Sequence, residues 1–228
     1  MVKFLLIDLD DTILDFHKAE QVALRKTLTQ FGVTPTDSVC SRYSEINRQH
    51  WERLERKELT REQVLVGRFA ALFAELEVQA DAKRCADQYA ENLGIGHYFL
   101  PGAPEALEAM AGKYTMYLAS NGTAKVQEGR LKSADISHYF ADIFISQNMG
   151  ANKPDKAYFD ACFARMPGFD PAQTMIVGDS LTSDILGGKN AGILTCWVNP
   201  KHKPCRQDIV PNYEIESISQ LPALLESL

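Results

Sequence analysis

The fold is decided by a stretch close to the N-terminus, Lys3-Phe4-Leu5-Leu6-Ile7-Asp8-Leu9-Asp10-Asp11-Thr12. Its first half is a continuous apolar run, which is typical of a strand buried on both faces of a parallel sheet. Its second half gathers three carboxyl groups at the point where this strand ends. Because ligands of open α/β sheets bind beyond the carboxyl ends of the strands, we expect the acids in a ligand crevice. The alternative is an acidic turn that caps the next helix, since Asp and Thr are good N-cap residues.

Three later strand-like runs also lead into polar groups. Tyr114–Ala119 is followed by Ser120-Asn121-Gly122-Thr123, Asp142–Ile145 by Asn152-Lys153-Pro154, and Thr174–Gly178 by Asp179 and, in the next turn, Asp184. The chain therefore supplies an acid pair, a hydroxyl, a lysine and a second acid pair, each after a separate strand. These groups together suit a phosphate site that also holds a cation.

The region between the first strand and the later ones has a helical pattern. Apolar residues recur at spacings of three and four in segments near 17–31, 38–56, 60–77 and 81–93. Thr60 followed by Gln63 predicts a capping box that opens the third of these helices. From Phe99 onward strands and helices alternate, which predicts βαβ units and a parallel sheet. The final segment, 201–228, has the pattern of a loop, a short edge strand and a last helix.

The sequence thus predicts an α/β fold with two domains. Residues 1–15 and 99–228 are expected to form a doubly wound parallel-sheet, Rossmann-like core. Residues 16–98 are expected to form an inserted α-helical domain, and a helical module unrelated to the acids is the alternative interpretation.

Composition limits the class of protein. The 228 residues carry a net charge of −6, which argues against coating a nucleic-acid polymer but permits one small phosphorylated substrate. The five cysteines are scattered without metal-site spacing, which favours buried thiols in a reduced, cytoplasmic compartment. We find no signal-peptide pattern and no apolar run near the roughly 20 residues that span a bilayer, so no membrane association is expected. The oligomeric state is left open between monomer and dimer.

In their order along the chain, the four motifs resemble the signature of the haloacid dehalogenase (HAD) superfamily. The matching residues are Asp8 to Thr12, Ser120, Lys153, and Gly178-Asp179 with Asp184. In that family an insertion after the first strand is a helical cap that closes over the active site. The resemblance therefore implies a HAD core with such a cap, and it covers nearly the whole chain.

The resemblance also implies roles for the acids in phosphomonoester hydrolysis. Asp8 would be the nucleophile that forms an aspartyl-phosphate, and Asp10 the acid that protonates the leaving group and then activates water. Mg²⁺ would be held by side-chain oxygens of Asp8 and Asp179 and by the backbone carbonyl of Asp10. Asp184 is expected behind these ligands, where it orients a metal-bound water or Lys153.

The remaining motif residues are expected around the phosphate. Ser120 would bind a non-bridging oxygen, and Lys153 would neutralise the phosphate and the nucleophile together. Asn121 is either a further phosphate ligand or a residue that shapes the turn. Asp11 has no catalytic role in this mechanism and is interpreted as a turn or capping residue, and Thr12 either supports the phosphate loop or caps a helix.

Asp10 also bears on which activity of the superfamily is expected. Dehalogenases of the family lack the acid two residues after the nucleophile, so its presence favours phosphoryl chemistry. Phosphonate hydrolases use a cap lysine, and neither Lys18 nor Lys57 lies in an obviously apolar context. A sugar-phosphate mutase stays open at this point.

The substrate class follows from a narrower resemblance. Ser183–Gly192 with Thr195–Asn199, and the stretch from Asn47 through Trp51 to Gly67-Arg68-Phe69, are similar to the bacterial pyrimidine 5′-nucleotidase branch. This implies a small-molecule phosphomonoester substrate, with UMP, dUMP or dTMP preferred. Trp51, Phe69, Phe16 or His17 would offer a flat face to the base, and Asn47 or Arg68 would read its edge or the sugar. The alternative is that Trp51 and Phe69 pack the interior of the helical domain.

Two other functions are kept beside the nucleotidase. One is a general small-metabolite phosphatase such as a phosphoglycolate phosphatase, which would use the same catalytic residues. The other is a non-catalytic sensor that binds a phosphometabolite in the same pocket.

Overall fold

The computed structural model describes residues 1–228 as two compact units. One consists of Met1–Phe16 together with His97–Leu228, and the other of His17–Gly96. These ranges lie close to the boundaries expected from the sequence. The roles of the two units as catalytic core and cap remain predictions.

The first unit contains a six-stranded, fully parallel sheet in the order β3-β2-β1-β4-β5-β6. Its strands are β1 Phe4–Ile7, β2 Thr115–Ser120, β3 Asp142–Ile145, β4 Thr174–Gly178, β5 Leu194–Val198 and β6 Tyr213–Ile215. This confirms the predicted α/β fold with a Rossmann-like core. The predicted short edge strand near the C-terminus is β6.

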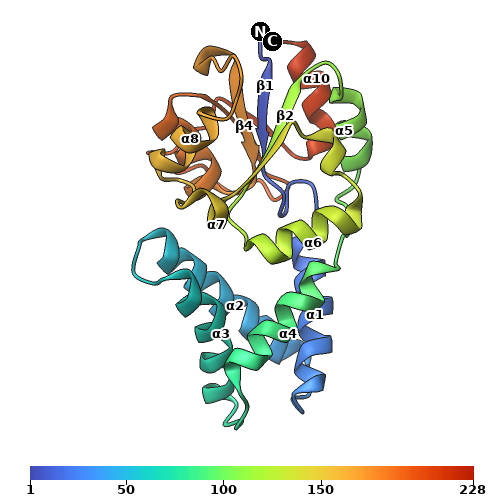
Figure 1. Ribbon diagram of the computed structural model, residues 1–228, viewed down its shortest axis with the longest axis vertical. Coiled ribbons are helices and arrows are strands. Elements are labelled where there is room, and N and C mark those ends of the chain that lie inside the picture. Colours follow the sequence, from blue (N-terminus) through green and yellow to red (C-terminus); the bar gives the residue numbers. More distant parts are fainter. The chain divides into compact units, whose positions relative to one another are not determined.

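Helices cover both faces of this sheet (Figure 1). They are α5 Ala103–Met110, α6 Ala124–Ala134, α7 Ser146–Met149, α8 Lys156–Phe163, α9 Leu186–Ala191 and α10 Leu221–Glu226. On β1, Leu5 and Ile7 pack into the cluster that includes residues of α5 and α10, whereas Leu6 packs with residues of α8. Both faces of the strand are therefore apolar, which explains its continuous hydrophobic run.

The register of the strands brings the motifs to one edge of the sheet. Ile7 pairs with Leu118 of β2 on one side and with Val177 of β4 on the other. Because the three strands run parallel, the residues that follow them emerge at the same end. The acids after β1 and β4 and the serine that ends β2 consequently meet there.

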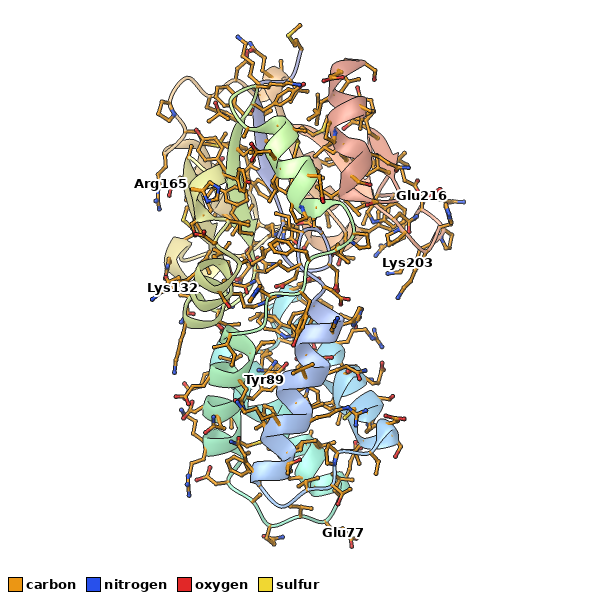
Figure 2. The ribbon with its side chains drawn as sticks, turned by 90° about the vertical axis from the view of Figure 1, so that its right-hand side faces the viewer. Glu77, Tyr89, Lys132, Arg165, Lys203 and Glu216 are labelled. Carbon is orange, nitrogen blue, oxygen red and sulfur yellow. The ribbon has the colours of Figure 1, made fainter.

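The second unit is made of four helices. They are α1 Phe16–Gln30, α2 Asp37–Glu55, α3 Arg61–Glu75 and α4 Ala82–Gly94. The first residue of α1, Phe16, is counted in the first unit. The predicted capping box opens α3, where Thr60 Oγ1 accepts from the Gln63 amide and the Gln63 side chain accepts from the Thr60 amide. The aromatic rings of Tyr43, Phe69 and Tyr89 pack together in this second unit, and Figure 2 shows Tyr89 among its helices.

Two further expectations concern cysteines and membranes. All five cysteines are free thiols and four of them are buried, as predicted. None of the helices combines the length and the hydrophobicity that crossing a bilayer would require.

Candidate active site

A buried lysine links two of the motif acids. Lys153 Nζ donates to Asp8 Oδ1 at 2.7 Å, to Asp184 Oδ1 at 2.6 Å and to the carbonyl of Ala119 at 2.6 Å. The three protons of the ammonium group thus each have an acceptor. Although burial disfavours its charge, the pKa of Lys153 is raised because the carboxylates of Asp184 and Asp8 stabilise the ammonium form.

Around this lysine the structure gathers three carboxylates, which we call the acid cluster: Asp8, Asp179 and Asp184. One oxygen of each lies within 4.8 Å of the others. Burial, together with the neighbouring acids, raises the pKa of Asp8 to about 7 despite the opposing effect of Lys153. Burial likewise raises the pKa of Asp179 well above its usual range, and the charges of Asp8 and Asp184 add to this effect. The acid cluster has more negative charge than one lysine can balance.

The segment after β4 holds the second acid pair in place. A Cβ on Gly178 would lie 2.2 Å from Asp184 Oδ2, so only glycine leaves room for this carboxylate. The same oxygen, Asp184 Oδ2, accepts from the Ser180 amide at 3.0 Å. Trp197 of β5 donates its indole N–H to the backbone carbonyl of Asp179 at 2.8 Å. Sequence reasoning missed this contact of Trp197.

The acid cluster suits a divalent cation. Its donors are carboxylate oxygens, which Mg²⁺ prefers, and a bound cation would offset the surplus of negative charge. Both oxygens of Asp184 already accept hydrogen bonds, from Lys153 and from a backbone amide, and Asp8 also accepts from Lys153. Asp8 and Asp179 stay the predicted side-chain ligands of the metal. The backbone carbonyl of Asp10 stays a predicted ligand.

Asp10 belongs to a different set of contacts. Its Oδ1 forms an ion pair with Nη1 of Arg130, and its Oδ2 accepts from Gln127 Nε2 at 2.7 Å. The same Gln127 nitrogen lies 2.7 Å from Ser120 Oγ. Gln127 and Arg130, both on α6, were missed by sequence reasoning. Their one signal was the placement of two polar residues three apart beside the apolar residues Val126 and Leu131.

Three further motif residues, Asn121, Asp11 and Thr12, make local contacts in the loops. Asn121 exchanges two hydrogen bonds with the backbone of Lys153, each of 2.9 Å, and so ties the loop after β2 to the lysine loop. Asp11 has a positive φ of 54° and accepts from the amide of Phe16 at 2.9 Å, which confirms it as a turn and capping residue. Thr12 is buried, and its hydroxyl lies 3.5 Å from Asp8 Oδ2. Whether Asn121 also binds phosphate stays a prediction.

The residues predicted to read the base lie in the helical unit. Asn47 and Arg68 are buried in what we call the helix network, which consists of Glu20, Ser44, Asn47 and Arg68. Glu20 accepts from Ser44 Oγ at 2.6 Å and from Asn47 Nδ2 at 2.7 Å, and Asn47 Oδ1 accepts from Arg68 Nη1 at 2.8 Å. Burial raises the pKa of Glu20.

Trp51 and Phe69 differ in exposure. Phe69 is fully buried, which confirms the interpretation that it packs the interior of the helical unit. Trp51 is partly exposed, with the guanidinium of Arg61 lying 5.6 Å from the centre of its ring. The substrate contacts predicted for Asn47, Trp51 and Arg68 remain predictions.

The arrangement at the sheet edge agrees with the comparison to known families. Residues 5–198 match the family of haloacid dehalogenase-like hydrolases. The chain belongs to the haloacid dehalogenase-like hydrolases. It is an enzyme of that class, as expected from the order of the four motifs.

Several members of this family are similar over nearly their whole length. The putative HAD-hydrolase YfnB of Bacillus subtilis is 38% identical over 97% of this chain and 94% of that protein. Its crystal structure, bound to magnesium, covers 98% of both chains with a TM-score of 0.94. The pyrimidine 5′-nucleotidase PynA of Streptococcus pneumoniae is 36% identical over 96% of this chain and 93% of that protein. The pyrimidine 5′-nucleotidase YjjG of Escherichia coli is 29% identical over 97% of both. These likenesses support a phosphoric monoester hydrolase of the nucleotidase branch.

Proposed function

We propose that this hydrolase is a Mg²⁺-dependent 5′-nucleotidase that acts on pyrimidine nucleoside monophosphates through an aspartyl-phosphate on Asp8. The observation that carries the chemical part is the division of the acids into two sets. Asp8 lies with Lys153 in the acid cluster, whereas Asp10, two residues away, is held by Arg130 and Gln127. Asp8, beside the positive charge of Lys153, can attack phosphorus, while Asp10 can transfer a proton.

In the first half-reaction Asp8 attacks the phosphorus atom. The bond between phosphorus and the ester oxygen breaks, its electron pair goes to that oxygen, and Asp10 supplies the proton. Lys153, which already contacts Asp8, offsets the repulsion between the carboxylate and the phosphate. Ser120, which is buried at the end of β2, would bind a non-bridging oxygen.

In the second half-reaction water hydrolyses the aspartyl-phosphate. Asp10, now a carboxylate, takes the proton of the attacking water, and Asp8 leaves as a carboxylate with inorganic phosphate released. The acid and the base of the cycle are therefore the same residue, which returns to its starting form after each turnover.

Mg²⁺ is the cofactor that the acid cluster fits. Asp8 and Asp179 would hold it, and when bound it would supply positive charge to the phosphate and to the nucleophile. Asp184 keeps Lys153 in place through a 2.6 Å contact, independently of the metal. We expect removal of the metal to abolish turnover without removing this contact.

The proposed substrate class is supported by the relatives named pyrimidine 5′-nucleotidases. Of the three residues predicted to read the nucleotide, Trp51 keeps part of its ring exposed, whereas Asn47 and Arg68 are buried in the helix network. We therefore place Trp51 first among the candidate base contacts. Its flat ring suits stacking on a base, which contributes about 1–3 kcal/mol in other proteins.

The test is phosphate release from a panel of esters, in Mg²⁺ and in EDTA. The panel contains UMP, dUMP, dTMP, AMP, GMP, phosphoglycolate and glucose phosphates. We expect release that requires Mg²⁺ and is fastest with the pyrimidine nucleotides. The Asp8→Asn variant should lose at least about a thousandfold of this activity, because an amide cannot form the phospho-enzyme.

A matched control separates chemistry from a general loss of charge. Asp160 lies on α8 with an exposed carboxylate that pairs with Lys156, so Asp160→Asn should retain full activity. Metal-dependent release that favours phosphoglycolate would keep the mechanism and reject the nucleotide substrate. Phosphate release by none of the esters would reject the phosphatase and favour the sensor.

A further inference from the structure

Two buried residues of α6 contact Asp10 and have no part in the mechanism above. Gln127 is 1% exposed and Arg130 is fully buried. They lie three positions apart, and residues at this spacing occupy the same face of a helix. Helix α6 follows directly on the loop that carries Ser120, so it connects the phosphate-binding motif to the acid after β1.

Gln127 joins Asp10 to Ser120 through a single nitrogen. Its Nε2 lies 2.7 Å from Asp10 Oδ2 and 2.7 Å from Ser120 Oγ. An amide nitrogen carries two protons in a fixed plane, so donating to both acceptors sets the separation of the carboxyl and the hydroxyl. Gly122 makes room for this arrangement, because a Cβ there would lie 2.5 Å from the Gln127 side chain.

Arg130 fixes the other oxygen of Asp10. Its guanidinium forms the ion pair with Oδ1, approaches Gln127 Oε1 at 3.3 Å and lies 5.8 Å from the ring centre of Phe16. Asp10 nevertheless keeps 29% of its side chain exposed. Both carboxyl oxygens of Asp10 thus contact side chains of α6, while part of the Asp10 side chain stays exposed.

We propose that Gln127 and Arg130 are positioning residues that hold the Asp10 carboxyl at a set distance from the phosphate oxygen bound by Ser120. This inference rests on the proposed phosphomonoesterase function. The step that it serves is departure of the leaving group. As the bond from phosphorus to the ester oxygen breaks, that oxygen takes the electron pair and a proton from Asp10. In the acid form that begins the step, Arg130 contacts a neutral carboxyl group; once the proton has left, the two residues form the ion pair of the structure.

The leaving group offers a way to detect positioning. The alkoxide of a nucleoside is a strong base and needs the proton in order to depart, whereas p-nitrophenolate is a stable anion and departs without it. The quantity kcat/KM covers all steps up to the departure of the leaving group. Misplacing Asp10 should therefore lower kcat/KM for an alkyl ester much more than for p-nitrophenyl phosphate.

The experiment compares Arg130→Met and Gln127→Met with the wild type on both kinds of ester. The alkyl ester is the nucleotide, or whichever alkyl monoester the wild type hydrolyses fastest. We expect kcat/KM for it to fall about a hundredfold, a typical contribution of general acid–base catalysis. The value for p-nitrophenyl phosphate should change by less than about threefold. Arg165→Met is the matched control, because Arg165 lies at the surface of the same unit with its side chain 50% exposed (Figure 2).

Two further variants distinguish positioning from a purely structural effect. Arg130→Lys keeps the charge and should recover part of the loss on the alkyl ester. The double variant Asp10→Asn/Arg130→Met should be no slower than Asp10→Asn alone, because a residue that acts through Asp10 has nothing to position once the acid is gone.

Each contrary result overturns the inference. Equal losses on both esters, or losses that multiply in the double variant, would mean that the two residues act on folding or on phosphate binding. A faster Arg130→Met would mean that the contacts restrain Asp10 away from the reaction. If Arg130→Met does not fold, Gln127→Met and Arg130→Lys carry the same comparison. A wild type that releases phosphate from no ester would reject the proposed function itself, which separates the two failures.

Discussion

Both units of this hydrolase bury carboxylates beside a basic side chain, but the balance of charge differs. The acid cluster sets three carboxylates against the single ammonium of Lys153. The helix network sets the one carboxylate of Glu20 against the one guanidinium of Arg68, with Asn47 between them. One site is short of positive charge, and the other is complete in itself.

The difference distinguishes a site built for a ligand from one built for packing. Burying a charge without a partner is costly, so a surplus of carboxylates favours either the binding of a cation or the uptake of protons. In the helix network the guanidinium of Arg68 instead lies 5.0 Å from the ring centre of Tyr89 and 5.5 Å from that of Phe69. Its charge is already met by a carboxylate, an amide and two aromatic faces.

The largest effect is expected from Lys153→Met. The variant leaves the carboxylates of the acid cluster, two of them buried, without their cation, so without metal the free energy of unfolding should fall by about 3–5 kcal/mol. Mg²⁺ should restore part of this loss, and activity should fall at least about a thousandfold. Chemical denaturation in EDTA and in Mg²⁺ measures the effect, with the exposed Lys156→Met as control. A variant as stable as the wild type in EDTA would refute the claim that the negative charge of the acid cluster exceeds its positive charge.

The corresponding change in the helix network is Arg68→Met. It removes the 2.8 Å bond to Asn47 and the charge of Arg68 near Glu20, so the free energy of unfolding should fall by about 2–3 kcal/mol. Mg²⁺ should not restore this loss, in contrast to Lys153→Met. The exposed Arg84→Met serves as the control. We expect KM for the nucleotide to stay within about threefold. A large rise in KM at unchanged stability would instead support the substrate contact predicted from the sequence.

The two sites also differ in how far the sequence predicted them. The acids were predicted because each follows a continuous apolar strand, and parallel strands deliver such residues to one edge. The positions of Asp8 and Asp179 therefore followed from local pattern alone. Glu20 gave no comparable signal, because its partners lie on other helices and a polar residue in a helical pattern is usually solvated.

Gln127 and Arg130 could not be predicted for a related reason. Their contact with Asp10 joins residues more than a hundred positions apart, and it depends on how α6 packs against the loop after β1. The hydrophobic period of a helix predicts which of its faces is buried, but not which polar group of another segment that face contacts. The sequence thus predicted the chemistry of Asp10 and left out the residues that hold it.

Mg²⁺ and protons are expected to compete for the carboxylates of the acid cluster. Burial raises the pKa of Asp8 to about 7, so below this pH the folded, metal-free protein holds a proton that the metal must displace. The affinity for Mg²⁺ should accordingly fall as the pH decreases below 7, by up to about tenfold per unit for each proton that the metal displaces from Asp8 or from Asp179, whose pKa burial also raises. Calorimetric titration with Mg²⁺ between pH 5.5 and 8 measures this, on the scale of about 1.4 kcal/mol per unit.

A matched variant makes the titration specific for the acid cluster. Asp179→Asn removes a proposed ligand while leaving the contacts of Lys153 in place, and it should weaken Mg²⁺ binding at every pH. Glu20→Gln, in the helix network, should leave the affinity unchanged. Binding of Mg²⁺ that does not vary between pH 5.5 and 8 would contradict a proton held by Asp8.

The smallest effect is expected from Glu20→Gln itself. Burial raises the pKa of Glu20 in the folded state. At a pH between the ordinary pKa of a glutamate and this raised value, the folded protein therefore keeps a proton that the unfolded chain has lost. The contribution of this residue to stability is therefore present below the ordinary pKa of a glutamate and is lost as the pH rises through the raised value. Nearby charges on Arg68 and His17 oppose the shift without reversing it.

Glutamine keeps an oxygen that can accept from Asn47 but has no proton to lose. As the pH rises, the wild type should consequently lose stability relative to Glu20→Gln, by at most about 1.4 kcal/mol per unit. Denaturation of both proteins in EDTA from pH 4 to 8 measures the difference, and Asp8 and Asp179 contribute equally to both. A constant difference would mean that the helix network holds Glu20 as a carboxylate throughout, so that its charge is fully compensated by Arg68. The contrast with the acid cluster would then be sharper still.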